Sequence, residues 1–192
     1  MRVLVVAEGK HERGGALENL LKRLGGDTAT FEFDRVSSPE IHAFHGKGQG
    51  YFKRAVGWLL TAEKRGVDAL VFLIDEDGQR DRVAQIGDAQ DSPISQLSRA
   101  MGVAIRRFDA WMLADEAALT GVLGYQIGRQ RDPENIRDPK AACASLLAES
   151  VASMTQTEMY ARIANQVDIA VLSARCPSGF APFAARVESA FG

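Results

Sequence analysis

Short apolar runs mark the predicted strands of this chain. Residues 2–7 and 69–74 are continuous apolar runs, long enough for a strand covered on both faces and too short for an isolated helix. Residues 28–35 alternate apolar with polar positions, which predicts a less buried strand near a sheet edge. Residues 103–108 predict a fourth, short strand. We expect the run at 69–74 to be a central strand of a parallel sheet.

Helical periodicity fills most of the remaining chain. Leu17, Leu20 and Leu24 recur at helical spacing, and the glycines at 25 and 26 end that pattern. Residues 36–50 predict a long loop, and residues 86–93 are polar and irregular. From Gly124 onward the pattern is helical only. The predicted helices cover residues 11–24, 51–65, 94–101, 111–119, 140–147, 156–167, 169–172 and 180–191.

This alternation of strands and helices predicts an α/β fold with a parallel sheet of about four strands and flanking helices. We expect residues 1–115 to form the α/β domain. Residues 116–192 are expected to form a C-terminal helical cap packed on it, so that the two parts make one compact unit.

Composition places the chain among ordinary soluble proteins. Of its 192 residues, 46% are hydrophobic and 25% charged, and its apolar stretches are far shorter than the roughly 18 residues of a membrane span. The N-terminus enters the first strand without a signal-peptide pattern, so a cytoplasmic location without membrane contact is expected. Cys143 and Cys176 lack metal-ligand spacing and are expected to be buried, reduced thiols.

Three of the four predicted strands are followed by an acidic residue. Glu8 follows the first strand, Asp75 and Asp77 the third, and Asp109 the fourth. Ligands bind beyond the carboxyl ends of the strands in such sheets, so these acids could converge there. Two carboxylates about 4 Å apart repel by roughly 4 kcal/mol at an effective dielectric near 20, which calls for a counter-charge. Oxygen ligands alone favour Mg²⁺ or Mn²⁺ over zinc, and the alternation along the strand turns Glu76 away.

The distribution of charge leaves two interpretations open. Residues 1–65 carry 11 Lys and Arg against 8 Asp and Glu, whereas residues 66–135 carry 7 against 12. A basic half beside an acidic centre suits a metal site that receives a polyanion. Scattered surface charge explains the same numbers equally well.

Other motifs fail on the same residues. A calcium EF-hand loop beginning at Asp75 would need glycine and glutamate where the chain has Arg80 and Ile86. Residues 46–50 lack the spacing of a phosphate-binding P-loop, and the segment after the first strand lacks the dinucleotide fingerprint. A haloacid-dehalogenase-type enzyme would carry threonine at Gln79. A receiver domain would carry its acidic pair where the chain has Glu8 alone.

The acids that follow the first and third predicted strands resemble a known family. Glu8-Gly9 and Asp75-Glu76-Asp77 look like the two signatures of the Toprim (topoisomerase–primase) fold, over about residues 1–115. That resemblance implies that a glutamate and an Asp-x-Asp pair coordinate Mg²⁺.

A narrower resemblance spans nearly the whole chain. It is to the small stand-alone Toprim-like proteins grouped as domain-of-unknown-function family 4276, in which glutamate commonly stands at Asp109 and a small hydroxyl residue at His11. The implied activity is nuclease-like, by analogy with other Toprim enzymes. The matching segments are residues 8–12, 46–48, 109–115, 138–140 and 176–183.

The leading hypothesis is therefore a Mg²⁺-dependent nuclease or phosphoryl-transfer enzyme that acts on nucleic acid. Glu8, Asp75, Asp77 and Asp109 would hold one or two cations, which activate water and stabilise the leaving oxygen. Glu12 is expected to join the metal site or to act as a base, or else to be an ordinary acid at a helix start.

Further residues are assigned supporting roles. Lys10 is expected to contact phosphate or to be a solvated loop lysine. Asp115 and Asp81 are expected to support the metal ligands. The candidate nucleic-acid contacts are Lys47, Lys53 and Arg54, with His42 and His45 as further substrate contacts.

Two alternatives stay open. One is a non-catalytic, metal-binding partner subunit of an ATPase in a defence or DNA repair system. The other is a small-molecule phosphohydrolase that uses the same acids. The sequence leaves the kind of nucleic acid and the oligomeric state undetermined.

Overall fold

A parallel sheet of four strands forms within the residues that the computed structural model describes, 1–39, 41 and 50–192. Hydrogen-bonded neighbours follow the order β2-β1-β3-β4, so β1 and β3 form the inner pair. Each neighbouring pair is parallel, which confirms the predicted α/β class with flanking helices. The strands are β1 (Arg2–Ala7), β2 (Thr30–Arg35), β3 (Ala69–Asp75) and β4 (Ser98–Ala104).

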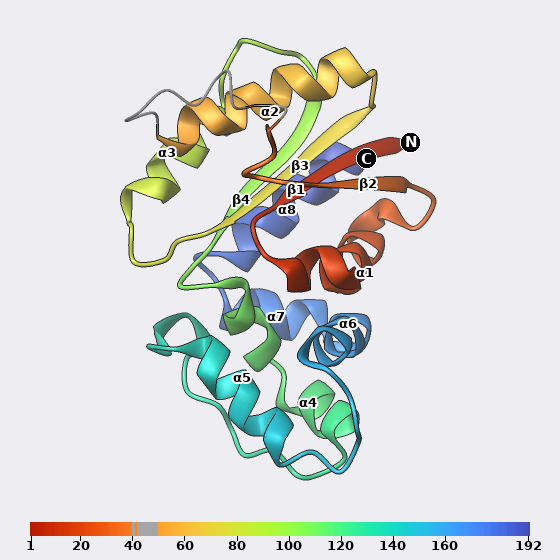
Figure 1. The fold of residues 1–192 in the computed structure, drawn as a ribbon, viewed down its shortest axis with the longest axis vertical. Coiled ribbons are helices and arrows are strands. Elements are labelled where there is room, and N and C mark those ends of the chain that lie inside the picture. Colours follow the sequence, from red (N-terminus) through yellow and green to blue (C-terminus); the bar gives the residue numbers. More distant parts are fainter. Residues whose placement is uncertain (40, 42–49) are drawn as a thin grey trace.

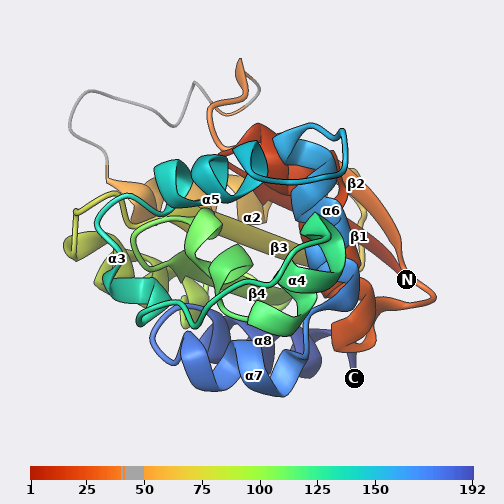
Figure 2. The ribbon, with the colours of Figure 1, turned by 90° about the horizontal axis from the view of Figure 1, so that it is seen from below.

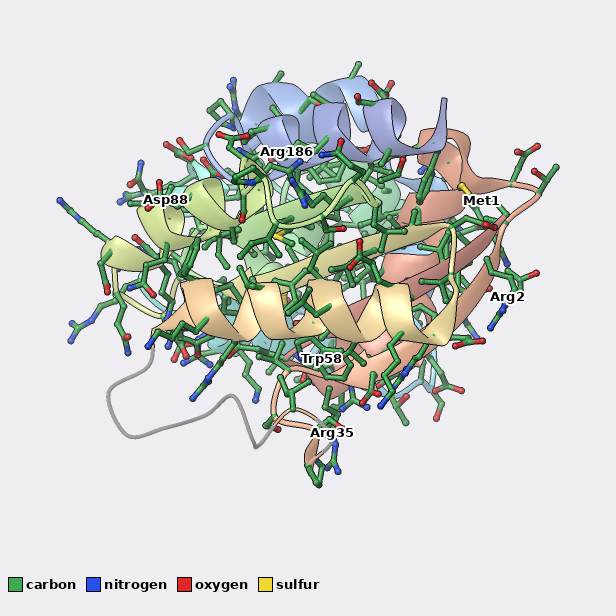
Figure 3. The ribbon with its side chains drawn as sticks, turned by 90° about the horizontal axis from the view of Figure 1, so that it is seen from above. Met1, Arg2, Arg35, Trp58, Asp88 and Arg186 are labelled. Carbon is green, nitrogen blue, oxygen red and sulfur yellow. The ribbon has the colours of Figure 1, made fainter. Side chains whose placement is uncertain are left out.

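One face of the sheet packs against α2 (Tyr51–Arg65) and α3 (Asp81–Gln90). Because strand side chains alternate, Leu4 and Phe72 point to this face, where they meet Trp58 of α2. Each is fully buried, and such burial stabilises the fold by about 1.5–3 kcal/mol per side chain. Figure 3 shows α2 along one side of the sheet and α8 along the other.

The opposite face packs against α1 (Leu17–Leu21) and α8 (Phe180–Phe191). Val5 and Val71 point to this face. The same apolar cluster continues into the C-terminal helices, because it also contains Trp111, Met159 and Phe183. One core therefore joins the sheet to the helices that follow it in sequence.

Helices α4 to α7 lie below the sheet in Figure 1 and in front of it when seen from below in Figure 2. They follow the short helix η4, which leads away from the end of β4. The remaining helical elements are η1 (Glu12–Ala16), η2 (Lys22–Gly26), η4 (Phe108–Leu113), α4 (Glu116–Leu123), η5 (Pro133–Asn135), α5 (Pro139–Ala148), α6 (Gln156–Gln166) and α7 (Ile169–Arg175).

The fourth strand lies earlier in the chain than predicted. Residues 94–101 were expected to be helical and 103–108 to be the strand, but β4 spans Ser98–Ala104. This segment is poor in β-branched residues, so its local propensity is weak, and pairing with β3 along seven positions decides its structure. Gly102 contributes to this weak propensity. Packing requires glycine there, because a Cβ would lie 2.5 Å from Cδ2 of Phe183 on α8.

The segment predicted to be irregular, residues 86–93, lies largely in α3. Arg82, Ile86 and Ala89 form its buried stripe, at the helical spacing of four and three residues. A buried arginine in place of an apolar residue, together with Gly87, concealed that stripe in the sequence.

Other local predictions are confirmed. Strand β2 lies at the sheet edge, and its residues are only partly buried or exposed. Cys143 and Cys176 are buried free thiols, and burial raises the pKa of Cys143 to about 12. None of the helices in the described ranges has the length and apolarity needed to cross a membrane.

Candidate functional site

The order in which strands are added to the sheet reverses between β1 and β3. From β1 the chain moves to β2 on one side, and from β2 it returns to β3 on the other side of β1. The helix after β1 lies on one face of the sheet, and the helix after β3 lies on the opposite face. The carboxyl ends of two such strands frame a crevice where α/β sheets bind ligands. Glu8 follows β1 at this point, and Asp75 ends β3.

Glu8 links the ends of these two strands. Its Oε2 accepts a hydrogen bond from the backbone N–H of Asp75 at 3.0 Å, and its Oε1 accepts one from the Tyr51 hydroxyl at 2.8 Å. The Arg82 guanidinium lies 3.7 Å from Oε2. Glu8 is therefore held by three partners, and its side chain is 26% exposed.

Asp75 is the carboxylate most strongly affected by its neighbours. Its Oδ1 accepts a hydrogen bond from the backbone N–H of Phe108 at 2.8 Å, which favours the charged form. Burial and the negative charges of Glu12, Glu8 and Asp109 act in the opposite direction and raise its pKa to about 8. These four carboxylates, Glu8, Glu12, Asp75 and Asp109, are called the acid cluster below.

Glu12 is buried in the first turn of η1, only 5% exposed. Burial raises its pKa, with further contributions from Asp109 and Glu8, while backbone N–H groups of Glu12 and Gly9 lower it. A Cβ on residue 9 would lie 2.0 Å from Oε2 of Glu12. Glycine at position 9 is therefore what allows the Glu12 carboxylate to fold back against the turn after β1.

Asp109 is the member of the acid cluster that η4 contributes, and it is buried. The Tyr160 hydroxyl on α6 donates a short hydrogen bond to its Oδ1, and the Cys143 thiol contacts its backbone oxygen at 3.5 Å. His11 packs beside Tyr160, with 5.1 Å between ring centroids. Burial lowers the pKa of His11, although Asp109 acts to raise it. The C-terminal helices thus hold one carboxylate of the cluster.

Arg82 and Tyr51 belong to this site and were missed by the sequence analysis. Arg82 donates from Nη1 to the backbone oxygen of Asp75 at 2.5 Å, and its guanidinium lies 4.3 Å from the Tyr51 ring centroid. It is 6% exposed, and its Nε has no hydrogen-bond partner among the described residues. The spacing of Arg82 with Ile86 and Ala89 is the sequence signal that could have placed it on a buried helix face.

Asp77 lies apart from the acid cluster. Its side chain is 40% exposed and forms an ion pair with Arg107 at 3.0 Å, from Nη2 to Oδ1. Its backbone φ of 51° is in the left-handed region, as is that of Arg106 at 63°. Glu76 is turned toward the segment after β4, where its Oε2 accepts from the Arg106 N–H at 3.2 Å. The role of Asp77 as a cation ligand stays a prediction.

The two acids predicted to support the metal ligands have other partners. Asp115 caps α4, where its Oδ1 accepts from the N–H groups of Ala117 and Ala118, and its Oδ2 accepts from Asp168 N–H at 2.8 Å. Asp81 begins α3 and accepts a hydrogen bond from the Gln85 amide. Both carboxylates thus stabilise helices.

Of the predicted nucleic-acid residues, the structure describes Lys53 and Arg54, which are neighbours on α2. Lys47 lies outside the described residues, as do His42 and His45. Lys53 is exposed on α2. Arg54 lies over the Tyr51 ring at 5.0 Å and lines a small cavity of about 120 Å³ beside Glu8. Lys10 is exposed on the turn after β1.

The donor chemistry of the acid cluster fits a divalent cation. Carboxylate oxygens are the ligands that Mg²⁺ and Mn²⁺ prefer. A cation would offset both the burial of the Asp75 charge and its repulsion by neighbouring acids, which together raise the pKa of Asp75. Across the described part of the chain, however, no three acidic, His or Cys side chains stand arranged around one point as metal ligands. Cation binding would therefore require the carboxylates to leave some of their present hydrogen-bond partners.

Comparison with known proteins identifies the family. The family model described as "Domain of unknown function (DUF4276)" matches residues 7–188, so the chain belongs to that family. A search of curated proteins and a search of solved structures each gave no match. The matched region includes the whole acid cluster, while the resemblance to Toprim proteins stays a prediction.

Proposed function

We propose that this member of the DUF4276 family is a divalent-cation-dependent enzyme that cleaves or transfers phosphodiester groups of nucleic acid at the acid cluster. One observation carries the proposal. Four carboxylates from three separate segments come together near the strand-order reversal, where burial and, after it, their mutual repulsion raise the pKa of Asp75 to about 8. Natural proteins retain such electrostatic strain mainly at functional sites.

A bound Mg²⁺ or Mn²⁺ would supply an activated water and stabilisation of the leaving oxygen. Glu8, Asp75 and Asp109 are the residues that would hold it. Glu12, whose pKa is raised by burial, is a stronger proton acceptor than an exposed glutamate and is suited to act as a general base. Lys10 is exposed on the same turn and free to approach a phosphate from solvent.

Hydroxyl groups orient two of these carboxylates. Tyr51 donates to Glu8 and Tyr160 donates to Asp109, each from a helix that packs against the sheet or η4. Arg82 places a positive charge beside Glu8 and tethers the end of β3. Removing such supporting partners from metal sites commonly costs about 10–100-fold in affinity or activity.

The direct test is a cleavage assay on labelled DNA and RNA with Mg²⁺, Mn²⁺ or EDTA. We expect cation-dependent cleavage that Asp75→Asn reduces by more than about 100-fold, because the variant loses a ligand charge while keeping its shape. Asp88→Asn is the matched control, since it removes one carboxylate from an exposed position of α3 that Figure 3 shows at the surface.

Two results would contradict the proposal. Cleavage that survives in Asp75→Asn would place the activity elsewhere. Calorimetry that detects cation binding, combined with no cleavage of any nucleic acid tested, would favour a cation-stabilised partner subunit over an enzyme.

A further inference from the structure

A basic groove lies beside the acid cluster, where the segment after β4 faces the start of α5. Two adjoining cavities of about 290 and 420 Å³ share Arg107 and Arg137 in their walls. Arg106 lines the first cavity and Lys140 the second. We call these two cavities together the Arg107 groove. Their size is that of ordinary ligand sites.

Positive charge in the Arg107 groove exceeds negative charge. Four cationic side chains line it, against the carboxylates of Asp77 and Asp138. Asp77 is paired with Arg107, and Asp138 is occupied in capping α5, where its Oδ1 accepts from the Ala141 N–H at 3.0 Å. The helix N-terminus offsets the charge of that cap.

Three of the four cations have no protein partner. Among the residues that the structure describes, the side chains of Arg106, Arg137 and Lys140 make no hydrogen bond or ion pair. Arg137 and Lys140 are exposed, and Arg106 is half-buried. A cavity in which cations outnumber carboxylates favours binding of an anion, and guanidinium groups match phosphate oxygens in geometry.

A second basic cavity differs from the Arg107 groove in the number of unpaired cations that line it. Arg129, Arg131 and Arg175 line about 310 Å³ between the segment after α4 and the end of α7. There Arg175 donates to both carboxylate oxygens of Glu116, at 3.0 and 3.2 Å, and to the Gln130 backbone oxygen. That leaves two cations of this cavity unpaired among the described residues, Arg129 and Arg131, against three in the Arg107 groove, which favours the Arg107 groove as the anion site.

The Arg107 groove is close to the acid cluster. The residue after Arg107 is Phe108, whose N–H donates to Asp75 at 2.8 Å. Lys140 is near enough to His11 to affect its pKa, and His11 also senses Asp109. The groove and the cluster are therefore neighbours at the same edge of the sheet.

We propose that the Arg107 groove binds phosphate groups of the ligand and presents a neighbouring phosphate to the acid cluster. The chemistry suits either consecutive phosphates of a nucleic-acid strand or the phosphates of a small molecule. Only the presentation of a phosphate to the acid cluster rests on the proposed function, because phosphate binding in the groove needs no catalysis.

The test measures binding in EDTA, so that neither cation binding nor cleavage contributes. One probe is a fluorescein-labelled single-stranded oligonucleotide followed by anisotropy, and the other is inorganic pyrophosphate followed by calorimetry. We expect Arg137→Gln with Lys140→Gln to weaken binding about tenfold at low salt and to reduce the salt slope for the oligonucleotide by about 1.4, as expected for two lost phosphate contacts.

Arg129→Gln with Arg131→Gln is the matched control, because it removes the same charge from exposed positions of the other basic cavity. Its binding should change less than about twofold. Oligonucleotide binding alone identifies a strand as the source of the phosphates, and pyrophosphate binding alone identifies a small ligand. Either result supports phosphate binding in the groove.

The proposal is overturned if the wild-type protein binds neither probe, or if both double variants lose affinity equally. Its failure can be separated from failure of the proposed function. Groove-dependent binding without cleavage contradicts only the enzyme, whereas cation-dependent cleavage with an unchanged KM in Arg137→Gln with Lys140→Gln contradicts only the groove.

Discussion

The acid cluster and the Arg107 groove are neighbours that differ in charge, in burial and in how far their charged groups are paired. The cluster is largely buried, and its carboxylates are held by backbone N–H groups, tyrosine hydroxyls and Arg82. The groove is open, and most of its cations lack partners among the described residues. Buried charge is costly, so each substitution in the cluster should affect stability, whereas groove substitutions should affect only ligand binding.

The largest effect is expected for Asp75→Asn as a function of pH in the cation-free protein. The folded pKa of Asp75, about 8, lies above its ordinary value of 3.8. The stability that the protonated form contributes is complete below about pH 4 and is lost as pH rises through about 8. Asn cannot ionise. When the pH rises from 5 to 9, the free energy of unfolding of the variant should therefore increase relative to that of the wild type by on the order of 3 kcal/mol.

Urea unfolding in EDTA at both pH values measures this difference. Parallel pH profiles for the wild type and Asp75→Asn would mean that burial and neighbouring charges do not raise the pKa of Asp75. Arg137→Gln with Lys140→Gln should retain the wild-type profile.

A smaller loss is expected for Tyr160→Phe, which leaves a carboxylate oxygen of Asp109 without its donor inside the core. The free energy of unfolding should fall by about 2 kcal/mol, because a buried acceptor without a partner bears its desolvation cost. Tyr51→Phe is the matched comparison. Glu8 is partly exposed and keeps two other partners, so the loss should be about half as large. Equal losses would contradict the different burial of the two acids.

Gly9→Ala should cost about 1–2 kcal/mol, because the added Cβ displaces the Glu12 carboxylate from its backbone donors. Gly87→Ala on α3 is the control, since nothing lies within 4 Å of a Cβ there, and alanine should stabilise that helix by about 0.5–1 kcal/mol. Thermal melting of both variants checks the prediction. A stable Gly9→Ala protein would show that Glu12 has room to relocate.

The smallest effect is expected in the groove. Asp77→Asn removes an ion pair whose two side chains are each about 40% exposed, and such pairs contribute less than about 1 kcal/mol. The melting temperature should change little, while oligonucleotide binding should tighten because Arg107 gains freedom to contact phosphate. A large loss of stability would place Asp77 with the buried acids instead.

Periodicity alone predicted most of the sheet. The β-branched runs of β1 and β3 and the alternation of β2 are local properties, so their strands could be recognised without knowledge of their neighbours. Strand β4 and helix α3 were misassigned because their structure depends on partners far away in sequence. Gly102 makes room for Phe183 of α8, and Arg82 of α3 lies beside Glu8, which follows β1.

The sequence by itself determined the fold class and named all four members of the acid cluster, of which Glu8 and Asp75 stand at strand ends that share an edge of the sheet. Tertiary structure alone decided the rest. It buried Glu12 behind Gly9 and turned Asp77 to Arg107. Burial and pairing depend on elements that meet only in the folded chain, so no local pattern of charges predicts which carboxylates become desolvated.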